Sequence, residues 1–415
     1  MKFLKVLFAV LLVMGTSSSS ADTLENAFKN GKFGGEFRFV YTGGSDSDVP
    51  ETVPVDNANV GSVALEMNYE TDDFYNFKLG IGFQVAHDLE FHDEDGSSED
   101  DARNSVSAAH LHNLYLQYAF LSSNIKVGNQ TIKLPMMMNS GAFALEDYFE
   151  AAVLTVNEIP DTTIKLIYVQ EWQKRYGSDS SGSFVQEDAH YDDGLFSLYF
   201  KNKSIEGVNL DGQYIMTNEE DNNGDPPVFS GGEYDQYYIR GNYKLPINHP
   251  LFIGLMYGGA DYDSTNADTN FYGIKIGTEL ANTKFDLAYT SVDDEASFPG
   301  TFGHVPDAVL YTAMLTNNTM YAGIEAVSLQ AIPDFGVKGL STRFKIAYFS
   351  QSEEGITNSG YNLDGATEFN ADVKFLLDKI LKGLSSRIWA GYGVYDQDVK
   401  EDDLLYARFY LTYRF

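Results

Sequence analysis

Cysteine is absent from the 415 residues, which excludes a fold stabilised by disulfides. Tryptophan occurs only twice, and the 11 prolines fall between apolar segments or at their margins. Long amphipathic helices and heptad repeats are also missing, so α-helical architectures are poor candidates. Stability must therefore come from extensive backbone pairing in an all-β fold.

Basic residues are scarce, with 28 Lys and Arg against 60 Asp and Glu, for a formal net charge of −32. Nucleic-acid binding requires a basic surface that neutralises phosphates, so no nucleic-acid partner is expected. A strongly acidic chain attracts cations where its charge lies along the path of a solute.

Long apolar runs are missing except at the N-terminus. Lys2 and Lys5 precede an apolar run over 6–14, and small residues follow at 19–21, which is the pattern of a signal peptide. We therefore expect a signal peptide at 1–21, a short periplasmic segment at 22–33 and a membrane domain at 34–415. The first run is too short to span a bilayer as a mature helix.

Aromatic residues are plentiful, with 28 Tyr and 29 Phe, and they follow a period of two. In 404–415 one face carries the apolar positions 405, 407, 409, 411, 413 and 415, whereas Arg408 and Tyr410 lie on the other. Such a strand is typical of a wall between lipid and water. The terminal Phe415 resembles the C-terminal signature that the barrel assembly machinery recognises in outer-membrane barrels.

Period-two segments recur along the whole chain and predict 18 strands. They lie near 34–41, 62–69, 77–86, 111–120, 125–130, 149–156, 162–170, 194–201, 208–218, 235–245, 251–258, 271–279, 284–292, 319–330, 340–350, 367–377, 385–394 and 404–415. Short and long connections alternate between them. This alternation predicts an antiparallel up-and-down transmembrane β-barrel with short periplasmic turns and long extracellular loops.

If the apolar positions face lipid, charged positions of both signs face the inside. The basic candidates are Arg38, Arg240, Arg343, Lys345, Arg387 and Arg408, and the acidic ones are Glu36, Glu66 and Asp372. Charge of both signs requires water, and 16–18 strands leave an aqueous channel. The alternative is that these charges only hydrate the wall and pair with one another.

The acidic excess lies in the long loops, at 87–101 and 219–225. Solvated loops explain such runs, but they also fit a negative vestibule for cations or divalent bridges to lipopolysaccharide. The stretch 93–96 lacks the ligand spacing of a calcium loop.

The connection 131–148 differs from the others because it is apolar and rich in methionine. Its candidate residues are Pro135, Met136, Met137, Phe143, Glu146 and Asp147. An apolar loop in water is unfavourable unless it packs against something, so we expect it to fold inward and narrow the channel. Alternatively, it covers the barrel mouth or contacts a neighbouring subunit.

Four segments suggest a family. Residues 128–132, 135–136 and 145–150 resemble the segment that leads into the constriction loop of OprD-type outer-membrane porins, and 22–31 looks like the mature start of such porins. The resemblance implies an 18-stranded channel in which small solutes diffuse past inward arginines. Arg240, Arg343, Arg387 and Arg408 match that role by their predicted facing.

The sequence therefore predicts a water-filled, mildly cation-selective porin that needs no cofactor. Outer-membrane lipid, lipopolysaccharide and small hydrophilic solutes are the expected partners, and a homotrimer is possible by analogy with general porins. His110 and His112 lie two residues apart and form the only pair whose spacing suggests a metal site. No sequence motif for a catalytic nucleophile is present, so an enzyme is not expected. A surface adhesin or structural barrel is the alternative, whereas a plugged Ton-dependent transporter needs a longer N-terminal domain.

Overall fold

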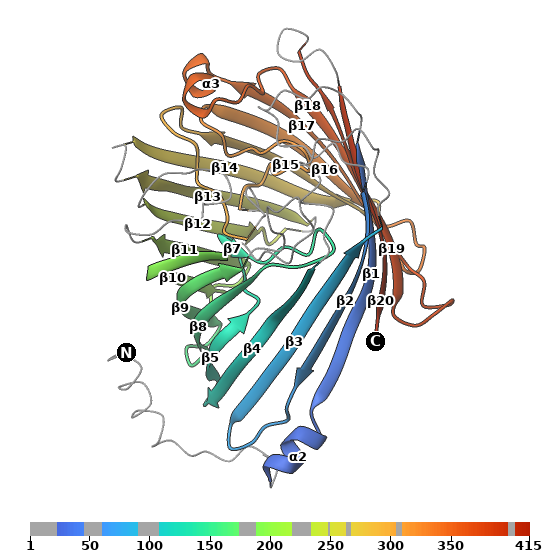
Figure 1. The fold of residues 1–415 in the computed structure, drawn as a ribbon. Coiled ribbons are helices and arrows are strands. Elements are labelled where there is room, and N and C mark those ends of the chain that lie inside the picture. The colour runs from blue at the N-terminus through green and yellow to red at the C-terminus, as the bar shows by residue number, and fades with distance from the viewer. Residues whose placement is uncertain are drawn as a thin grey trace.

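The fold is a closed sheet of 18 antiparallel strands, shown in Figure 1. The computed structural model describes residues 23–44, 60–89, 108–173, 188–217, 234–247, 250–262, 267–303, 309–396 and 403–415. The predicted signal peptide and the acidic stretches 90–101 and 219–225 lie outside these residues.

The first half of the sheet is formed by nine strands. They are β1 (Lys32–Gly44), β2 (Val60–Glu70), β3 (Phe77–Asp88), β4 (Ala108–Phe120), β5 (Ser123–Gln130), β8 (Tyr148–Val156), β9 (Thr162–Gln173), β10 (Asp188–Asn202) and β11 (Val208–Met216). The second half is formed by β12 (Tyr234–Lys244), β13 (Leu251–Tyr262), β14 (Ala267–Leu280), β15 (Thr283–Val292), β16 (Ile324–Pro333), β17 (Leu340–Gln351), β18 (Thr367–Leu376), β19 (Leu384–Val394) and β20 (Leu404–Arg414).

Each strand of the sheet pairs with the next one along the chain, and β1 pairs with β20 to close the ring. Phe37 lies opposite Leu65 of β2 on one side and opposite Tyr413 of β20 on the other. Closure leaves no unpaired sheet edge, so the backbone N–H and C=O groups of every strand find hydrogen-bond partners within the sheet. The predicted all-β up-and-down barrel of 18 strands is confirmed.

Many strand boundaries differ from the sequence prediction by a few residues. β1 begins at Lys32 rather than Gly34, and the strand predicted at 319–330 begins at Ile324 and ends at Pro333. Gly323 explains the second shift, because its φ of 70° lies in the left-handed region and ends the preceding turn. The connection before β16 is therefore longer than expected.

Four further short elements lie outside the barrel strands in the described residues. The helix α2 (Leu24–Lys29) begins after Thr23, whose hydroxyl accepts a hydrogen bond from Asn26 N, and α3 (Glu353–Ser359) begins after Ser352 in the same way. The two helices lie at opposite ends of the barrel in Figure 1. The short strands β6 (Lys133–Leu134) and β7 (Met137–Met138) form a hairpin inside the apolar connection after β5.

The turn at 157–161 is linked to the neighbouring turn through Glu158. Its carboxylate accepts hydrogen bonds from the hydroxyls of Ser122 and Ser123 and from Ser122 N. The hydrogen bond from Ser123 is the main reason that the pKa of Glu158 lies below its usual value. Adjacent turns at this end of the barrel are therefore tied together by side chains.

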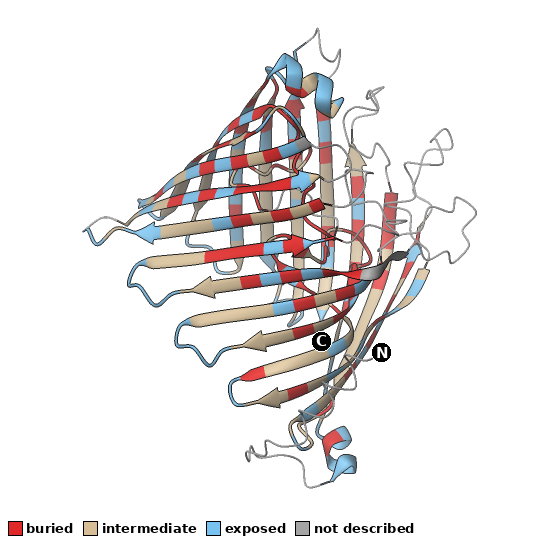
Figure 2. Ribbon diagram, turned by 90° about the vertical axis from the view of Figure 1, so that its left-hand side faces the viewer, coloured by how far each residue is buried: buried red, intermediate tan, exposed pale blue. Residues whose placement is uncertain are grey.

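The two faces of the sheet differ in chemistry. Large apolar side chains are exposed on one face, such as Phe37 at 48% and Leu255 at 58%, whereas Glu36 and Arg38 on the other face are each 8% exposed. Figure 2 shows this alternation along the strands, with exposed turns at their ends. No helix in the described ranges is both long enough and apolar enough to cross a membrane.

The main hydrophobic core lies between the polar-side wall and two long connections. It includes Met136 and Met137 from the connection after β5, Phe298 and Phe302 from the connection after β15, and Trp172 from β9. All five side chains are less than 4% exposed. The two connections therefore pack together against the side of the wall that also carries the charges.

Candidate functional site

Residues 131–147 connect β5 to β8 and contact strands far from that hairpin. Met136 N donates to Gln213 Oε1 of β11 at 3.0 Å, and the Tyr410 hydroxyl of β20 donates to Ala142 O at 2.8 Å. Gln84 of β3 makes two hydrogen bonds to the backbone of Glu146, at 2.7 and 3.0 Å. One connection is thus held by strands on both sides of its own hairpin.

Arg38 anchors the same connection and joins two predicted acidic residues. Its guanidinium donates to Phe143 O at 2.7 Å and to Gly141 O at 3.1 Å. It lies 2.6 Å from Glu36 Oε1 and 3.6 Å from Glu146 Oε1. Such charge-assisted bonds fix a loop more firmly than neutral ones, and Arg38 and Glu36 are both buried.

The backbone of the connection is also bound from within. Ser140 N donates to Asp147 Oδ2 at 3.2 Å, and Asn139 Nδ2 donates to Glu146 Oε2 at 2.7 Å. Asp147 is fully buried, as are Met136 and Met137, whereas Pro135 is partly exposed. The six residues singled out from this segment therefore lie together in one compact loop.

The described parts of a second connection, the one after β15 (residues 293–303 and 309–323), pack against the first connection, and this packing was not predicted from the sequence. Met138 N donates to Phe302 O at 2.8 Å, and Phe302 N donates to Met136 O at 3.1 Å, which forms a short parallel bridge. The Thr301 hydroxyl adds a hydrogen bond to Pro135 O at 3.0 Å. The apolar residues 298, 302, 309, 310, 314 and 320 were the available signal for this packing.

Charged side chains of the wall hold the second connection in place. The Glu368 carboxylate of β18 accepts from the backbone N–H groups of Leu315, Thr316 and Asn317, each at 3.0 Å. Lys345 Nζ of β17 donates to the carbonyl oxygens of Tyr311 at 3.0 Å and Ala313 at 2.8 Å. Both charges therefore satisfy backbone groups of this connection. Lys345 was predicted as a lining residue, and Glu368 was missed.

Two of the predicted arginines form close pairs with carboxylates. Arg240 donates to both oxygens of Asp211, at 3.2 and 2.9 Å, and Asp211 also accepts from the Tyr238 hydroxyl. Arg387 donates to both oxygens of Asp372, at 2.7 and 2.8 Å. Two parallel bonds of this kind fix the geometry of each pair.

Two further arginines have different surroundings. Arg408 lies over the rings of Phe143 at 4.5 Å and Trp389 at 5.5 Å, and it donates to the Tyr406 hydroxyl at 2.8 Å. Arg343 lies opposite Asp372 in the strand register, but its side chain is exposed. Neither arginine forms a salt bridge within the described residues.

Glu66 belongs to a cluster with the histidines of β4. Its carboxylate lies 3.4 Å from His112 Nε2 and accepts from Asn68 Nδ2 at 2.5 Å. The rings of His110 and His112 pack beside Tyr148, with centroids 6.5 and 6.4 Å away. Among the residues that the structure describes, no group of three or more His, Cys, Asp or Glu side chains is arranged to hold a metal ion.

Comparison with solved structures places the fold. OccK3 of Pseudomonas aeruginosa is 14% identical, with 94% of this chain and 97% of that chain covered and a TM-score of 0.71. OccAB1 of Acinetobacter baumannii is 13% identical over 96% and 99% of the two chains, with a TM-score of 0.75. OccD3 of P. aeruginosa is 13% identical over 97% and 95%, with a TM-score of 0.72.

No family model and no curated protein matches the sequence. At 13–14% identity, the likeness to the Occ structures concerns the fold. It extends over nearly the whole length of both chains, so the barrel and its connections are matched as one unit. The resemblance to OprD-type porins that the sequence indicates is thereby confirmed in its architecture, because the chain has the 18-stranded barrel fold of the Occ proteins.

Proposed function

We propose that the chain is an outer-membrane porin of a Gram-negative bacterium, through which small hydrophilic solutes and ions diffuse passively. One observation carries this proposal: a closed 18-stranded barrel has apolar side chains outside and paired charges inside. The apolar face suits lipid, and charges on the inner wall need water. Barrels of 16–18 strands are wide enough for an aqueous channel.

Residues 131–148 narrow this channel in our proposal. The hydrogen bonds from Arg38, Gln84, Gln213 and Tyr410 support it, because they join this segment to four strands around the ring. Solutes then pass beside this loop and the second connection, along Arg38, Arg240, Arg343, Lys345, Arg387 and Arg408 and the acidic Glu36, Glu66 and Asp372.

The channel has a mild preference for cations. Arg38, Arg240 and Arg387 are each paired with a carboxylate, so they contribute little net positive charge. The chain as a whole carries a formal charge of −32, which raises the local concentration of cations near the pore.

Planar-bilayer recording of the purified protein tests the proposal. We expect stable single-channel currents and a reversal potential in a salt gradient that has the sign of cation selectivity. A folded protein that carries no current would instead favour a structural or adhesive barrel, and a reversal potential of the opposite sign would overturn the selectivity alone.

A further inference from the structure

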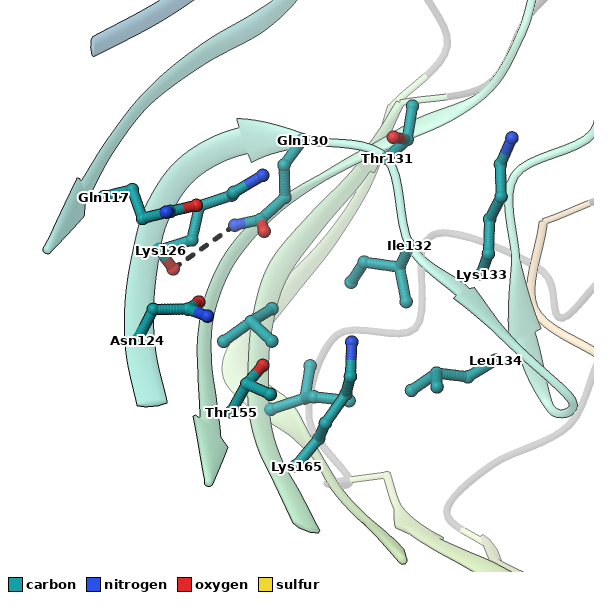
Figure 3. A pocket seen from close by; sticks show the side chains of 12 residues that line it. Gln117, Asn124, Lys126, Gln130, Thr131, Ile132, Lys133, Leu134, Thr155 and Lys165 are labelled. Carbon is teal, nitrogen blue, oxygen red and sulfur yellow. Dashed lines mark hydrogen bonds between the residues drawn. The ribbon is translucent and has the colours of Figure 1, made fainter. Parts of the chain in front are cut away.

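A pocket of about 280 Å³ lies on the wall formed by β4, β5, β8 and β9, next to the start of the 131–147 connection (Figure 3). Lys126 of β5 and Lys165 of β9 line it, together with Thr155 of β8 between them. Ile132 and Leu134 of the connection face these strands and cover one side. The pocket is therefore a partly enclosed site with two cations and an apolar cover.

The strand register places both lysines on the inner face. Lys165 of β9 lies opposite Thr155 of β8, and Lys126 of β5 lies opposite Val153, two residues before Thr155 on β8. Paired residues share a face of a sheet, and the intervening Leu166 on the other face is 49% exposed. One strand separates β5 from β9, so the two backbones are roughly 10 Å apart, a span that two lysine side chains can close around one small group.

Neither ammonium group forms a salt bridge with a carboxylate among the described residues. Lys126 Nζ lies 4.0 Å from the centroid of the Tyr115 ring. The nearby Glu70 carboxylate is bound to Lys78 Nζ at 3.0 Å and to the Tyr115 hydroxyl at 2.9 Å. This differs from Arg240 and Arg387 on the other walls, each of which is paired with a carboxylate. Two half-buried like charges in one pocket repel each other, and a bound anion relieves that repulsion.

We propose that this pocket binds a phosphate group, either free phosphate or the head of a small phosphomonoester. A compact group with up to two negative charges matches two ammonium groups that approach from opposite sides of β8. The Thr155 hydroxyl and the Asn124 amide supply neutral hydrogen-bond donors in the same pocket. The cavity exceeds one phosphate group in size, and Ile132 and Leu134 provide an apolar surface for a short organic group. The proposed channel supplies the route by which such a solute reaches the pocket.

Calorimetric titration of the whole detergent-purified protein tests the site without any need for current. Inorganic phosphate and glycerol 3-phosphate are titrated in parallel, with succinate as a dianion of different chemistry. We expect Lys126→Gln and Lys165→Gln each to weaken phosphate binding about tenfold, because each removes one charge-assisted contact. Lys126→Arg retains the charge and should retain most of the binding.

The matched control is Lys374→Gln, which removes one positive charge from β18 across the barrel and should leave the affinity unchanged. Tighter binding of glycerol 3-phosphate than of inorganic phosphate assigns the pocket to phosphomonoesters, and the reverse order assigns it to free phosphate. Absence of binding by the folded wild type, equal binding of succinate, or an equal loss in the control variant overturns the proposal.

A bilayer recording separates this site from the proposed channel function. Phosphate added to a conducting wild-type channel should produce brief blocks that are lost in Lys126→Gln and Lys165→Gln. If the channel carries chloride current without phosphate blocks and calorimetry detects no binding, the phosphate site is rejected and the porin function is retained. Calorimetric binding by a protein that carries no current supports the pocket and rejects the porin.

Discussion

At the scale of single residues, the inner wall neutralises much of its own positive charge. Arg240 is paired with Asp211, Arg387 with Asp372, and Glu36 is shared by Arg38 and Arg414. The Arg387–Asp372 pair is more exposed than the Arg38–Glu36 and Arg240–Asp211 pairs, so its contribution to stability is small and its effect on the local potential is larger. Changing one member of a pair should therefore alter selectivity more than folding.

Asp372→Asn tests this idea. The substitution leaves Arg387 without its carboxylate, so we expect the reversal potential to move toward anion selectivity. Arg387→Gln should move it in the opposite direction, and the double variant should return it close to the wild-type value. The free energy of unfolding should change by about 1 kcal/mol or less, because the Arg387 side chain is 34% exposed.

Glu206→Gln is the control for that series, because Glu206 is exposed in the turn between β10 and β11. It removes the same charge from the chain outside the barrel interior. A shift as large as that of Asp372→Asn would show that total charge, rather than the pairing of Arg387, sets the selectivity.

Glu368 is the second residue with a specific expectation. Its carboxylate binds three backbone N–H groups of residues 315–317, and the Glu368 side chain is fully buried. Leu315 N also donates to Asn370 Oδ1 at 3.0 Å, so Glu368→Ala leaves the N–H groups of Thr316 and Asn317 unpaired, at a cost of about 1–3 kcal/mol for each that stays buried. We therefore expect the 309–323 segment to detach locally, with faster hydrogen exchange of those amides and larger current fluctuations.

Glu368→Gln should give an intermediate result, because an amide oxygen still accepts hydrogen bonds without the charge. Glu325→Gln on β16 is the control, since that carboxylate is exposed. Unchanged exchange at 315–317 in Glu368→Ala would mean that the segment is held by its apolar contacts alone.

At the scale of elements, two long connections behave as one unit. The bridge between Met137 and Phe302 joins residues 131–147 to residues 293–303, and both segments share one hydrophobic core. A single loop in a wide barrel would be free to move, whereas two loops that are joined to each other are supported from both sides of the ring. The bridge between the two connections should therefore control the stability of the proposed constriction.

A disulfide across the bridge tests this control. The chain has no native cysteine, so Met137→Cys combined with Phe302→Cys introduces a single possible pair. Paired residues on adjacent strands lie within the Cα separation that a disulfide requires. We expect the pair to oxidise readily and the oxidised channel to show fewer current fluctuations than the reduced one. The single-cysteine variants serve as controls, and failure to oxidise in the folded protein would contradict the bridge.

Much of this architecture could be predicted from the sequence because period-two patterns are local. A few neighbouring residues were enough to identify the strand that contains Phe37 and Arg38, and the same holds for the apolar segment 131–148. The second connection was missed because its role depends on a contact between Met136 and Phe302, which are far apart along the chain. Glu368 was missed for the same reason, since the amides it binds lie about 50 residues earlier.

At the scale of the whole molecule, the barrel depends on the join between β1 and β20. Phe415 N and O both bond to Gly35, at 3.1 Å each, and the Phe415 ring packs beside Phe33 and Tyr413. A Cβ at Gly35 would lie 2.7 Å from that ring and 2.3 Å from Glu66 O, so only glycine fits there. The last residue therefore completes the wall as well as carrying the proposed assembly signal.

Phe415→Ala separates these two roles. If the barrel assembly machinery recognises Phe415, the variant should reach the outer membrane of cells in much lower amounts than the wild type. After refolding in detergent, where no machinery is present, it should form a barrel with nearly wild-type heat resistance, because its backbone bonds to Gly35 remain and its ring is 48% exposed. Phe33→Ala removes the ring that packs on Phe415 and is the control, because it should assemble normally in cells. If both variants lose heat resistance equally after refolding, the aromatic contact between β1 and β20 is structural. If Phe415→Ala assembles normally in cells, Phe415 has no role in recognition.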